Sequence, residues 1–302
     1  MKKESLLRNY KQNKMLYWMI LPIVVYVLIF NYLPMLGLVM SFQNYSLTKG
    51  IFGSKWVGLK NFQDFFQSMY FGRTLGNTLK LSGLCLLFAF PAPIIFALML
   101  NEVRNSKFKK VIQTVSYMPH FVSMIVVACL IISFTNSSGL FADIAVMMGG
   151  TRKSYISDPK YFRTIFVVSE IWQGIGFNSI IYLSALSSVS EELYEAARID
   201  GAGRIAQLFH ITIPGIMSTI IIMFILRCGS IMTVNFEKIL LLYTPATYET
   251  ADVIQTYVYR IGLIKQKIGY STAVGLFNSV CGFGLIVFTN FLSKKYTEIS
   301  MF

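Results

Sequence analysis

Two charged residues, Glu170 and Arg227, stand inside long apolar stretches of this 302-residue chain. A charge near the middle of a membrane helix costs about 2.5–3.5 kcal/mol on insertion scales, so its presence predicts a partner or a function. Two explanations are open. The two side chains form an ion pair with each other, or they line a passage for a polar solute.

The stretch that follows Glu170 contains further side chains suited to a polar solute. Trp172 offers a ring that stacks on a sugar face, and Gln173 and Asn178 offer amides that hydrogen-bond to hydroxyls. Together with Glu170 and Arg227, these residues form a predicted substrate pathway. Close packing of membrane helices at Gly174 and Gly176 is the alternative interpretation of the same stretch.

The composition indicates which elements position these residues. Hydrophobic residues make up 55% of the chain, charged residues only 14%, and the mean hydropathy is +0.58. A soluble domain carries about 25% charged residues. This balance excludes a disordered chain, a secreted disulfide scaffold and an ordinary cytosolic enzyme. We predict an all-α, polytopic membrane protein with six spans, at residues 16–42, 74–100, 111–134, 163–186, 211–232 and 272–292.

Basic residues indicate the orientation of these spans. If the N-terminus is cytoplasmic, the inner segments hold 13 Lys and Arg residues in about 60 positions, and the outer segments hold 11 in 97. Both termini are therefore expected in the cytoplasm. The first apolar stretch is too long for a signal peptide and is expected to remain as an anchor that bends near Asn31 and Pro34. The positive net charge reflects topology and attraction to anionic lipid, and no soluble basic domain predicts nucleic-acid binding.

Other chemistries find little support in the sequence. The four cysteines lie in apolar stretches without a C-x-x-C spacing, and the two histidines lack carboxylate or thiol neighbours at ligand spacing. No metal site is predicted. A membrane-embedded enzyme would need a nucleophile with a base, or clustered metal ligands, within the spans.

The segment between the fourth and fifth spans, residues 187–214, differs from a short basic loop. Ser188 and Glu191 fit a capping box, and Gly201 and Gly203 supply a stop, so we predict a helix of about three turns between them. A second helix is expected from near Ile205 to Pro214. An elbow of this kind, with small residues at its tip, suits insertion into a cleft of another protein. An ordinary interfacial amphipathic loop is the alternative.

This segment resembles the EAA loop of ABC importer permeases, on the residues Glu195, Ala196, Ala197, Asp200, Gly201 and Ala202, followed by Phe209-x-Ile211-Thr212-Ile213-Pro214. Two positions depart from the pattern: Ile213 replaces the usual Leu, and Met217 replaces a later Pro. Other stretches resemble the carbohydrate branch and its LplB-type subfamily: Trp56-Val57-Gly58-Leu59-x-Asn61-Phe62, Tyr117-Met118-Pro119-His120 and Asn235-Phe236-Glu237.

The resemblance implies a type I ABC importer permease with a MetI-like core in the bacterial plasma membrane. The domains would be a cytoplasmic tail at 1–15, the first helix and outer loop at 16–73, the permease domain at 74–293 and a second tail at 294–302. Residues 187–214 would form the coupling loop, the name used below. The implied partners are a second permease of similar fold, two ATPase subunits, an extracellular substrate-binding lipoprotein, a carbohydrate substrate and membrane lipid.

The implied function is import of an oligosaccharide or polysaccharide fragment by alternating access, with ATP and magnesium bound by the partner ATPase and no cofactor bound by this chain. A P-loop needs a Gly-Lys pair, and the chain contains none. The alternative is an ion-coupled secondary transporter of a polar solute, which would require discontinuous helices and paired acidic residues at the midplane.

Overall fold

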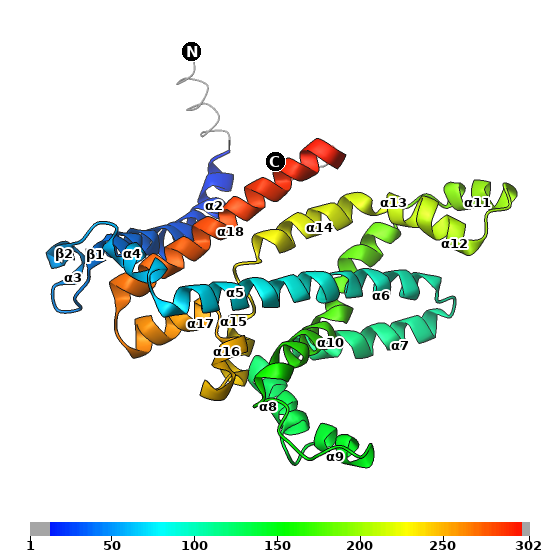
Figure 1. Cartoon of the computed structure of the whole chain (residues 1–302). Helices are drawn as coiled ribbons and strands as arrows, with labels where there is room; N and C mark the ends of the chain where they lie inside the picture. Colours follow the sequence, from blue (N-terminus) through cyan, green and yellow to red (C-terminus); the bar gives the residue numbers. More distant parts are fainter. Residues whose placement is uncertain (1–12, 298–302) are drawn as a thin grey trace. The chain divides into compact units, whose positions relative to one another are not determined.

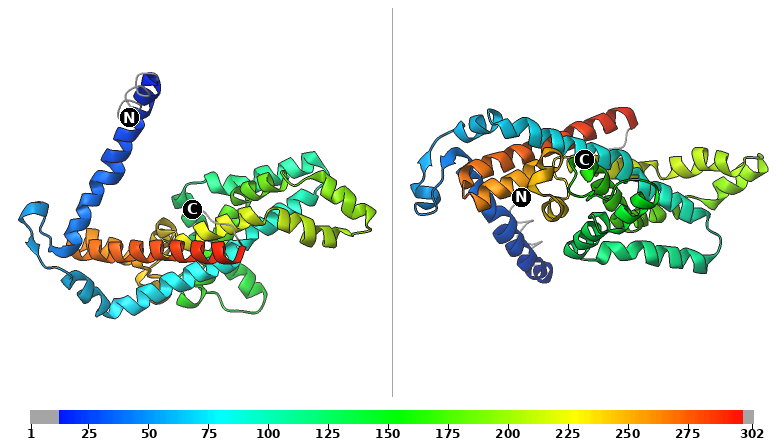
Figure 2. Two further views of the ribbon diagram at one scale, coloured as in Figure 1. Left: turned by 90° about the horizontal axis from the view of Figure 1, so that it is seen from above. Right: turned by 60° about the horizontal axis from the view of Figure 1, so that its bottom comes forward.

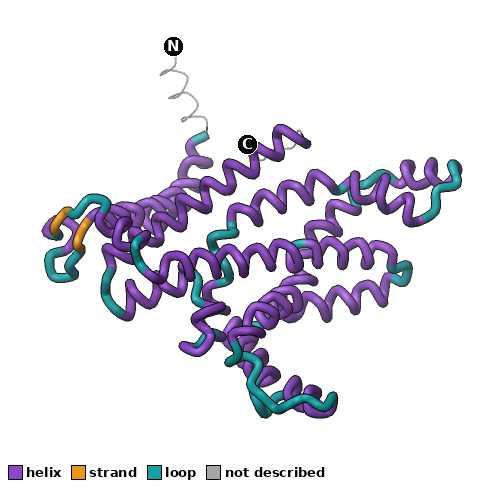
Figure 3. The backbone as a smooth tube through the Cα atoms, viewed as in Figure 1, coloured by secondary structure: helices purple, strands orange, loops and turns teal. Residues whose placement is uncertain are grey.

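The computed structural model describes residues 13–297, and the predicted tails lie largely outside this range. The described chain is mostly helical, with one short two-stranded hairpin (Figure 3). It divides into two compact units. The first comprises the chain up to Gln67 together with Arg260–Leu276, and the second comprises Ser68–Tyr259 and the chain from Phe277 onward.

The first unit begins with the apolar helix predicted as the first span. Helix α2 (Lys14–Val27) continues into the π-helix η1 (Leu28–Tyr32) and the 3-10 helix η2 (Leu33–Phe42) (Figure 2). None of the α2 side chains is buried in this chain. The hydrogen-bonding pattern changes at the predicted place. Pro34 lacks an N–H and its ring crowds the carbonyl four residues earlier, which disfavours regular α-helical hydrogen bonding at this place.

A small cap follows this helix. Strands β1 (Gln43–Asn44) and β2 (Lys55–Trp56) pair antiparallel, with Gln43 opposite Trp56, and the short helix α3 (Gly50–Gly53) lies in the loop between them. The amide of Asn61, in helix α4 (Lys60–Phe66), donates to the carbonyls of Ser41 and Gln43 at 2.8 and 3.0 Å. Asn61 therefore fixes the start of the hairpin, which gives the Trp56–Phe62 motif a structural role. The π-helix η7 (Arg260–Ile264) and the first turns of α18 (Ile268–Thr297) complete this unit.

The second unit begins with a long helix that was predicted as the second span. Helix α5 (Met69–Leu84) passes through the π-helix η3 (Cys85–Ala89) into α6 (Pro91–Glu102), and α7 (Ser106–Tyr117) follows after a short turn (Figure 1). Both α6 and α7 pack against the later helix α10 (Pro159–Leu186). The side chain of Asn105 caps α7 by accepting from the backbone N–H groups of Lys107 and Phe108. The π-turn precedes Pro91, which would otherwise interrupt the ladder of hydrogen bonds.

The predicted third span at 111–134 is wrong in its boundaries. Helix α7 ends at Tyr117, the 3-10 helix η4 (Met118–Phe121) contains Pro119, and α8 (Met124–Thr135) begins anew after Ser123, whose hydroxyl caps it. The apolar helix of membrane length is α8 together with α9 (Leu140–Met147). The apolar residues at the end of α7 were read as the start of the span, because a proline break does not alter local hydropathy.

The rest of the second unit alternates one long helix with several short ones. Helix α10 (Pro159–Leu186) is followed by α11 (Glu191–Ile199), α12 (Arg204–Gln207), the π-helix η5 (Leu208–Thr212), α13 (Ile213–Gly215) and α14 (Met217–Gly229). A bend of 59° separates the α12–α13 segment from α14. The 3-10 helix η6 (Pro245–Thr247) and the short helices α15 (Phe236–Leu242), α16 (Tyr248–Ala251) and α17 (Ile254–Tyr259) then precede α18.

The core of the second unit holds these helices in place. Phe162 and Phe166 of α10 are fully buried against Leu81 of α5 and Ile239 of α15. A polar cluster adds to this packing: Arg73 forms an ion pair with the buried Asp252 at 3.2 Å, and Arg163 donates to the Asn77 side chain at 2.9 Å. Within the described residues, five helices and one bent pair are long and apolar enough to cross a membrane. The prediction of an all-α polytopic fold is therefore confirmed.

Candidate functional site

The coupling loop carries a short helix whose two ends are well capped. The Ser190 hydroxyl accepts from the backbone N–H of Glu192, and Glu191 and Glu192 lie in the first turn of α11. The predicted capping by Ser188 is wrong, because its hydroxyl donates to the Ala185 carbonyl at 2.7 Å and closes the end of α10. Acidic residues beside the N-terminus of a helix interact favourably with its dipole.

The C-terminal end of α11 explains the glycine of the motif. The N–H of Ala202 donates to the carbonyl of Ala197 at 2.8 Å, and that of Gly201 donates to Arg198 at 3.1 Å. These two bonds form a Schellman motif, in which the residue at the Gly201 position takes a left-handed conformation. The φ of Gly201 is +77°. A glycine is favoured here for its backbone freedom, since the space around its Cα is open.

The surface of α11 is exposed around these motif residues. Glu195, Ala196 and Asp200 are exposed, and Ala197 and Ala202 are half-buried. Ile199, at the end of the helix, is 86% exposed. In Figure 1, α11 lies at the extremity of the second unit, beyond α12 and α13. The loop therefore presents small, apolar and acidic side chains on a projecting surface.

Hydrogen bonds that sequence reasoning missed join α11 to the base of α14. The Tyr194 hydroxyl donates to the Thr212 hydroxyl at 3.0 Å, and the Thr212 hydroxyl donates in turn to the carbonyl of Gln207 at 3.3 Å. The Gln207 amide donates to the Ala202 carbonyl at 2.8 Å. Thr212 is part of the sequence motif that ends at Pro214, so its importance was predictable, whereas no sequence pattern identified Tyr194 as its hydrogen-bond partner. These bonds connect α11 to η5, which continues into α13, the segment that precedes α14.

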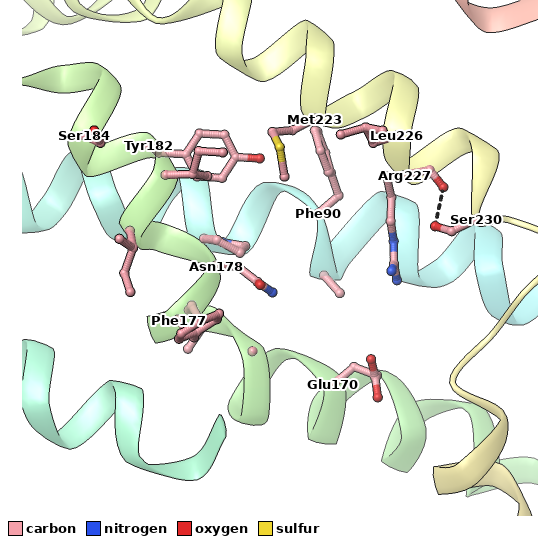
Figure 4. A pocket seen from close by; sticks show the side chains of 16 residues that line it. Phe90, Glu170, Phe177, Asn178, Tyr182, Ser184, Met223, Leu226, Arg227 and Ser230 are labelled. Carbon is pink, nitrogen blue, oxygen red and sulfur yellow. Dashed lines mark hydrogen bonds between the residues drawn. The ribbon is translucent and has the colours of Figure 1, made fainter. Parts of the chain in front are cut away.

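A cavity of about 730 Å³ lies between α6, α10 and α14 of the same unit, with its walls shown in Figure 4. Three of the five predicted pathway residues line it: Glu170, Asn178 and Arg227. Phe90, Phe177 and Tyr182 add aromatic rings to the wall, and sequence reasoning assigned no role to them. A cavity of this size, with aromatic walls and a few polar groups, is typical of a small-molecule site.

Trp172 and Gln173 do not line this cavity. Helical geometry explains the position of Trp172, because residues 170, 174, 177, 178 and 181 share one face of α10 and residue 172 is turned away from it. Gln173 lies at the edge of that face, and the helical period alone does not explain why it is not part of the wall. Trp172 has 46% of its side-chain surface exposed. Gly174 lines the cavity, whereas Gly176 lies so close to the Ser116 carbonyl of α7 that an added Cβ would collide with it. The packing interpretation is thus correct for Gly176.

Glu170 forms an ion pair, but its partner is Lys238 instead of Arg227. The Lys238 ammonium lies 2.6 Å from the Glu170 carboxylate, and the Asn235 amide donates to the same oxygen at 3.0 Å. Lys238 is fully buried, with Ser169 as a second partner at 3.4 Å and the ring of Phe166 beside it. The predicted ion pair of Glu170 with Arg227 is therefore wrong. Lys238 belongs to α15, a helix of seven residues in the predicted outer segment 233–271, and the fold packs this short helix against α10.

Arg227 extends from α14 toward the same space (Figure 4). Among residues 13–297, the ion pairs do not include Arg227. Arg227 also lines a second, smaller cavity of about 200 Å³, together with Ser82, Cys85, Glu170 and Asn235. In the described part of the chain, no group of three His, Cys, Asp or Glu side chains is placed to hold a metal ion.

Comparison with known proteins gives consistent results. The family described as binding-protein-dependent transport system inner membrane component matches residues 89–298. The chain is 45% identical over 293 residues to Protein LplB of Bacillus subtilis strain 168, which covers 97% of this chain and 92% of that protein. It is 43% identical over 298 residues to the polygalacturonan/rhamnogalacturonan transport system permease protein YteP of the same organism, with 98% and 93% covered.

Solved structures are similar over the whole fold. The chain matches, at 42% identity and a TM-score of 0.90, a chain in the crystal structure of a bacterial ABC transporter involved in the import of the acidic polysaccharide alginate. The match covers 97% of this chain and 99% of that chain. A second structure, of a bacterial alginate ABC transporter in complex with alginate pentasaccharide-bound periplasmic protein, gives a TM-score of 0.91 at 42% identity, with 98% and 99% covered.

Proposed function

Because this chain belongs to the family of binding-protein-dependent transport system inner membrane components, we propose that it is the permease subunit of an ATP-driven oligosaccharide importer. The resemblance to carbohydrate ABC importer permeases, predicted from sequence motifs, is confirmed by these relatives. We further propose that ATPase subunits act on this chain through the coupling loop and that the substrate passes through the cavity between α6, α10 and α14. The geometry of the coupling loop is the observation that carries it.

The coupling loop has the properties of a docking element. Its helix projects from the second unit, its ends are capped, and Ile199 and Leu193 expose apolar surface that a cleft on a partner would bury. The Tyr194–Thr212 bond connects the helix to the segment below α14. ATPase subunits that bind this loop would therefore move α14, and with it Arg227 and one wall of the cavity. Such movement is the basis of alternating access.

The arrangement of positive charge supports a cytoplasmic position for this loop. Arg104, Lys107, Lys109 and Lys110 lie at the α6–α7 turn, at the same end of the second unit as α11 (Figure 1). Lys294 and Lys295 lie in the last turn of α18. Clusters of Lys and Arg favour the cytoplasmic side of a membrane protein. We therefore place the coupling loop and both termini in the cytoplasm.

The proposed partners follow from the family and from the named relatives. A second permease of similar fold and two ATPase subunits would complete the translocation unit, with ATP and magnesium bound by the ATPases. A substrate-binding protein would deliver the oligosaccharide from outside. The names of the relatives refer to polygalacturonan, rhamnogalacturonan and alginate, which supports an oligosaccharide as the substrate here.

The ion-coupled alternative fits the cavity less well. Such a transporter would place paired acidic residues at the binding site. Glu170 is the only carboxylate among the residues that line the larger cavity within the described chain, and it is already bound to Lys238. The bend before α14 provides a discontinuous helix, but a helix break without acidic ligands offers no site for a driving cation.

The test is uptake by the complete importer in proteoliposomes, with a Gly201→Val substitution as the informative variant. A branched side chain at φ +77° is strained, so the substitution disrupts the end of α11 although an added Cβ meets no neighbouring atom. We expect uptake of trigalacturonate or trimannuronate to require ATP and to fall at least about tenfold in the variant, since a shift of about 1.4 kcal/mol corresponds to a factor of ten.

The matched control is Gly203→Ala, because Gly203 has ordinary backbone angles and open space around its Cα. This variant should transport nearly as well as the wild type. Uptake driven by an ion gradient without ATPase subunits, or wild-type uptake and ATPase stimulation in Gly201→Val, would contradict the proposal.

A further inference from the structure

Arg227 is a charged residue in an otherwise uncharged membrane helix, α14. The remainder of α14 is formed by apolar, small and hydroxyl side chains, and an arginine within a membrane helix is unfavourable unless another group interacts with it. Arg227 lies in the last turn of α14, where the helix dipole favours a cation. That effect is small at a helix end, and the Cys85 thiol, which is a hydrogen-bond partner of the guanidinium, is only a weak acceptor. Neither interaction neutralises the charge of Arg227.

Glu170, the carboxylate on α10 that the sequence suggests as a partner, does not form an ion pair with Arg227. Glu170 is bound by Lys238 at 2.6 Å and by Asn235 at 3.0 Å, and Lys238 is fully buried. A buried ammonium that lost this carboxylate would be left uncompensated, so Glu170 is held in its place by Lys238. The two charges cancel, and Arg227 contributes the remaining positive charge of the cavity wall.

The rest of the wall is neutral and suited to a sugar. Asn178 and Ser230 offer hydrogen-bonding groups, and Phe90, Phe177 and Tyr182 offer rings, all in the same cavity as Arg227. Figure 4 shows the arginine side chain pointing from α14 toward the space between the helices, across from Glu170 on α10. A ligand in this cavity would therefore meet neutral polar groups, aromatic faces and one cation.

We propose that Arg227 binds a carboxylate of an acidic oligosaccharide, such as a uronate unit, as the substrate passes through the cavity. This inference rests on the proposed import function and names the substrate class of the same site. The guanidinium presents a planar fork that matches the two oxygens of a carboxylate. A single cation, partly exposed to the cavity, also permits release, since a transport site that held its substrate with several ion pairs would retain it.

The test uses the complete importer without its binding protein in lipid nanodiscs, so that the binding protein does not select the ligand. The probes are trigalacturonate and trimannuronate, each with its carboxyl-reduced, neutral counterpart. We expect the wild type to bind an acidic probe at least about tenfold more tightly than its neutral counterpart, because a hydrogen bond to a charged group is stronger than one to a neutral group. Arg227→Gln should abolish this preference, and Arg227→Lys, which keeps the charge but loses the fork, should retain part of it.

A double variant, Glu170→Gln with Lys238→Met, separates the two charges of the wall. It removes a cancelling pair and leaves the net charge of the cavity unchanged, so the preference for the acidic probe should persist. An acidic preference that survives Arg227→Gln, or one that disappears in the double variant, would overturn the inference. So would a wild type that binds acidic and neutral probes equally.

Uptake by the same preparation, with the binding protein restored, reports separately on the proposed function. ATP-driven uptake of acidic and neutral probes at equal rates, in wild type and Arg227→Gln alike, would overturn the role of Arg227 and leave the import function intact. Absence of ATP-driven uptake of every probe would overturn the import function, and the inference with it.

Discussion

The coupling loop exposes its polar side chains on a projecting surface, whereas the cavity between α10 and α14 keeps its charged side chains within the spans. In the loop, the capping bonds join residues at most five positions apart, and the Tyr194–Thr212 bond joins residues 18 apart. In the cavity, the Asn235–Glu170 bond joins residues 65 apart. The first region is a local structure that the motif itself encodes. The second depends on how distant helices pack.

This contrast has an energetic consequence. Loss of a local exposed bond leaves groups that water can solvate, so the effect is expected on coupling rather than on folding. Loss of one partner from a buried pair leaves a charge that has no other partner, so the effect is expected on folding. The variants below test this distinction, beginning with the largest expected effect.

Glu170→Gln should destabilise the protein most. It leaves the fully buried Lys238 without its carboxylate, and breaking a buried pair in this way costs about 3–5 kcal/mol. Thermal unfolding of the purified complex in detergent measures the effect. The double variant with Lys238→Met should recover most of the loss, because it removes the uncompensated charge.

The matched control for this prediction is the exposed ion pair of Arg152 with Asp143, whose side chains are 51% and 46% exposed. Asp143→Asn removes one partner of a pair in water, which is worth about 0.2–1 kcal/mol. Equal destabilisation by the two single variants would show that the Glu170–Lys238 pair is not buried in the assembled importer.

Tyr194→Phe should have a smaller effect, directed at coupling. It removes the hydroxyl that donates to Thr212, at a cost of about 0.5–1.5 kcal/mol for one hydrogen bond. We expect unchanged assembly and basal ATPase activity, with a several-fold lower stimulation of ATPase by the binding protein with its oligosaccharide. Thr212→Val should give the same loss, and the double variant should add little to either. Additive losses would argue against a shared link between α11 and α14.

The sequence was informative where the structure is local. The EAA-like motif is contiguous, so the helix, its glycine stop and its position between two spans were all predictable, although the N-cap moved from Ser188 to Ser190. Glu170 and Arg227 were predictable as cavity residues because charged groups in apolar helices are rare. Trp172, Gln173 and Asn178 were predictable by residue type alone, and of these three Asn178 lines the cavity, whereas the helical period places Trp172 on another face of α10.

The remaining features depend on packing that no local pattern records. Lys238 occurs in a short helix between spans, and only the folded arrangement brings it against α10. The third span was misplaced because hydropathy is continuous across Pro119, while the helix is not. Tyr194 and Thr212 meet only because the chain reverses at Gly201. In each case a residue of ordinary local appearance acquires its role from a distant neighbour.

The central claim is that α11 is where this permease receives the force of ATP hydrolysis, and site-specific photo-crosslinking tests it most directly. A benzophenone amino acid replaces Ile199, which is 86% exposed on α11, in the complete importer. The control probe replaces Phe52, which is fully exposed in the hairpin loop of the segment predicted to be extracellular. The account predicts an adduct with the ATPase subunit from position 199 and none from position 52. An ATPase adduct from position 52, with none from position 199, would contradict both the coupling role and the orientation.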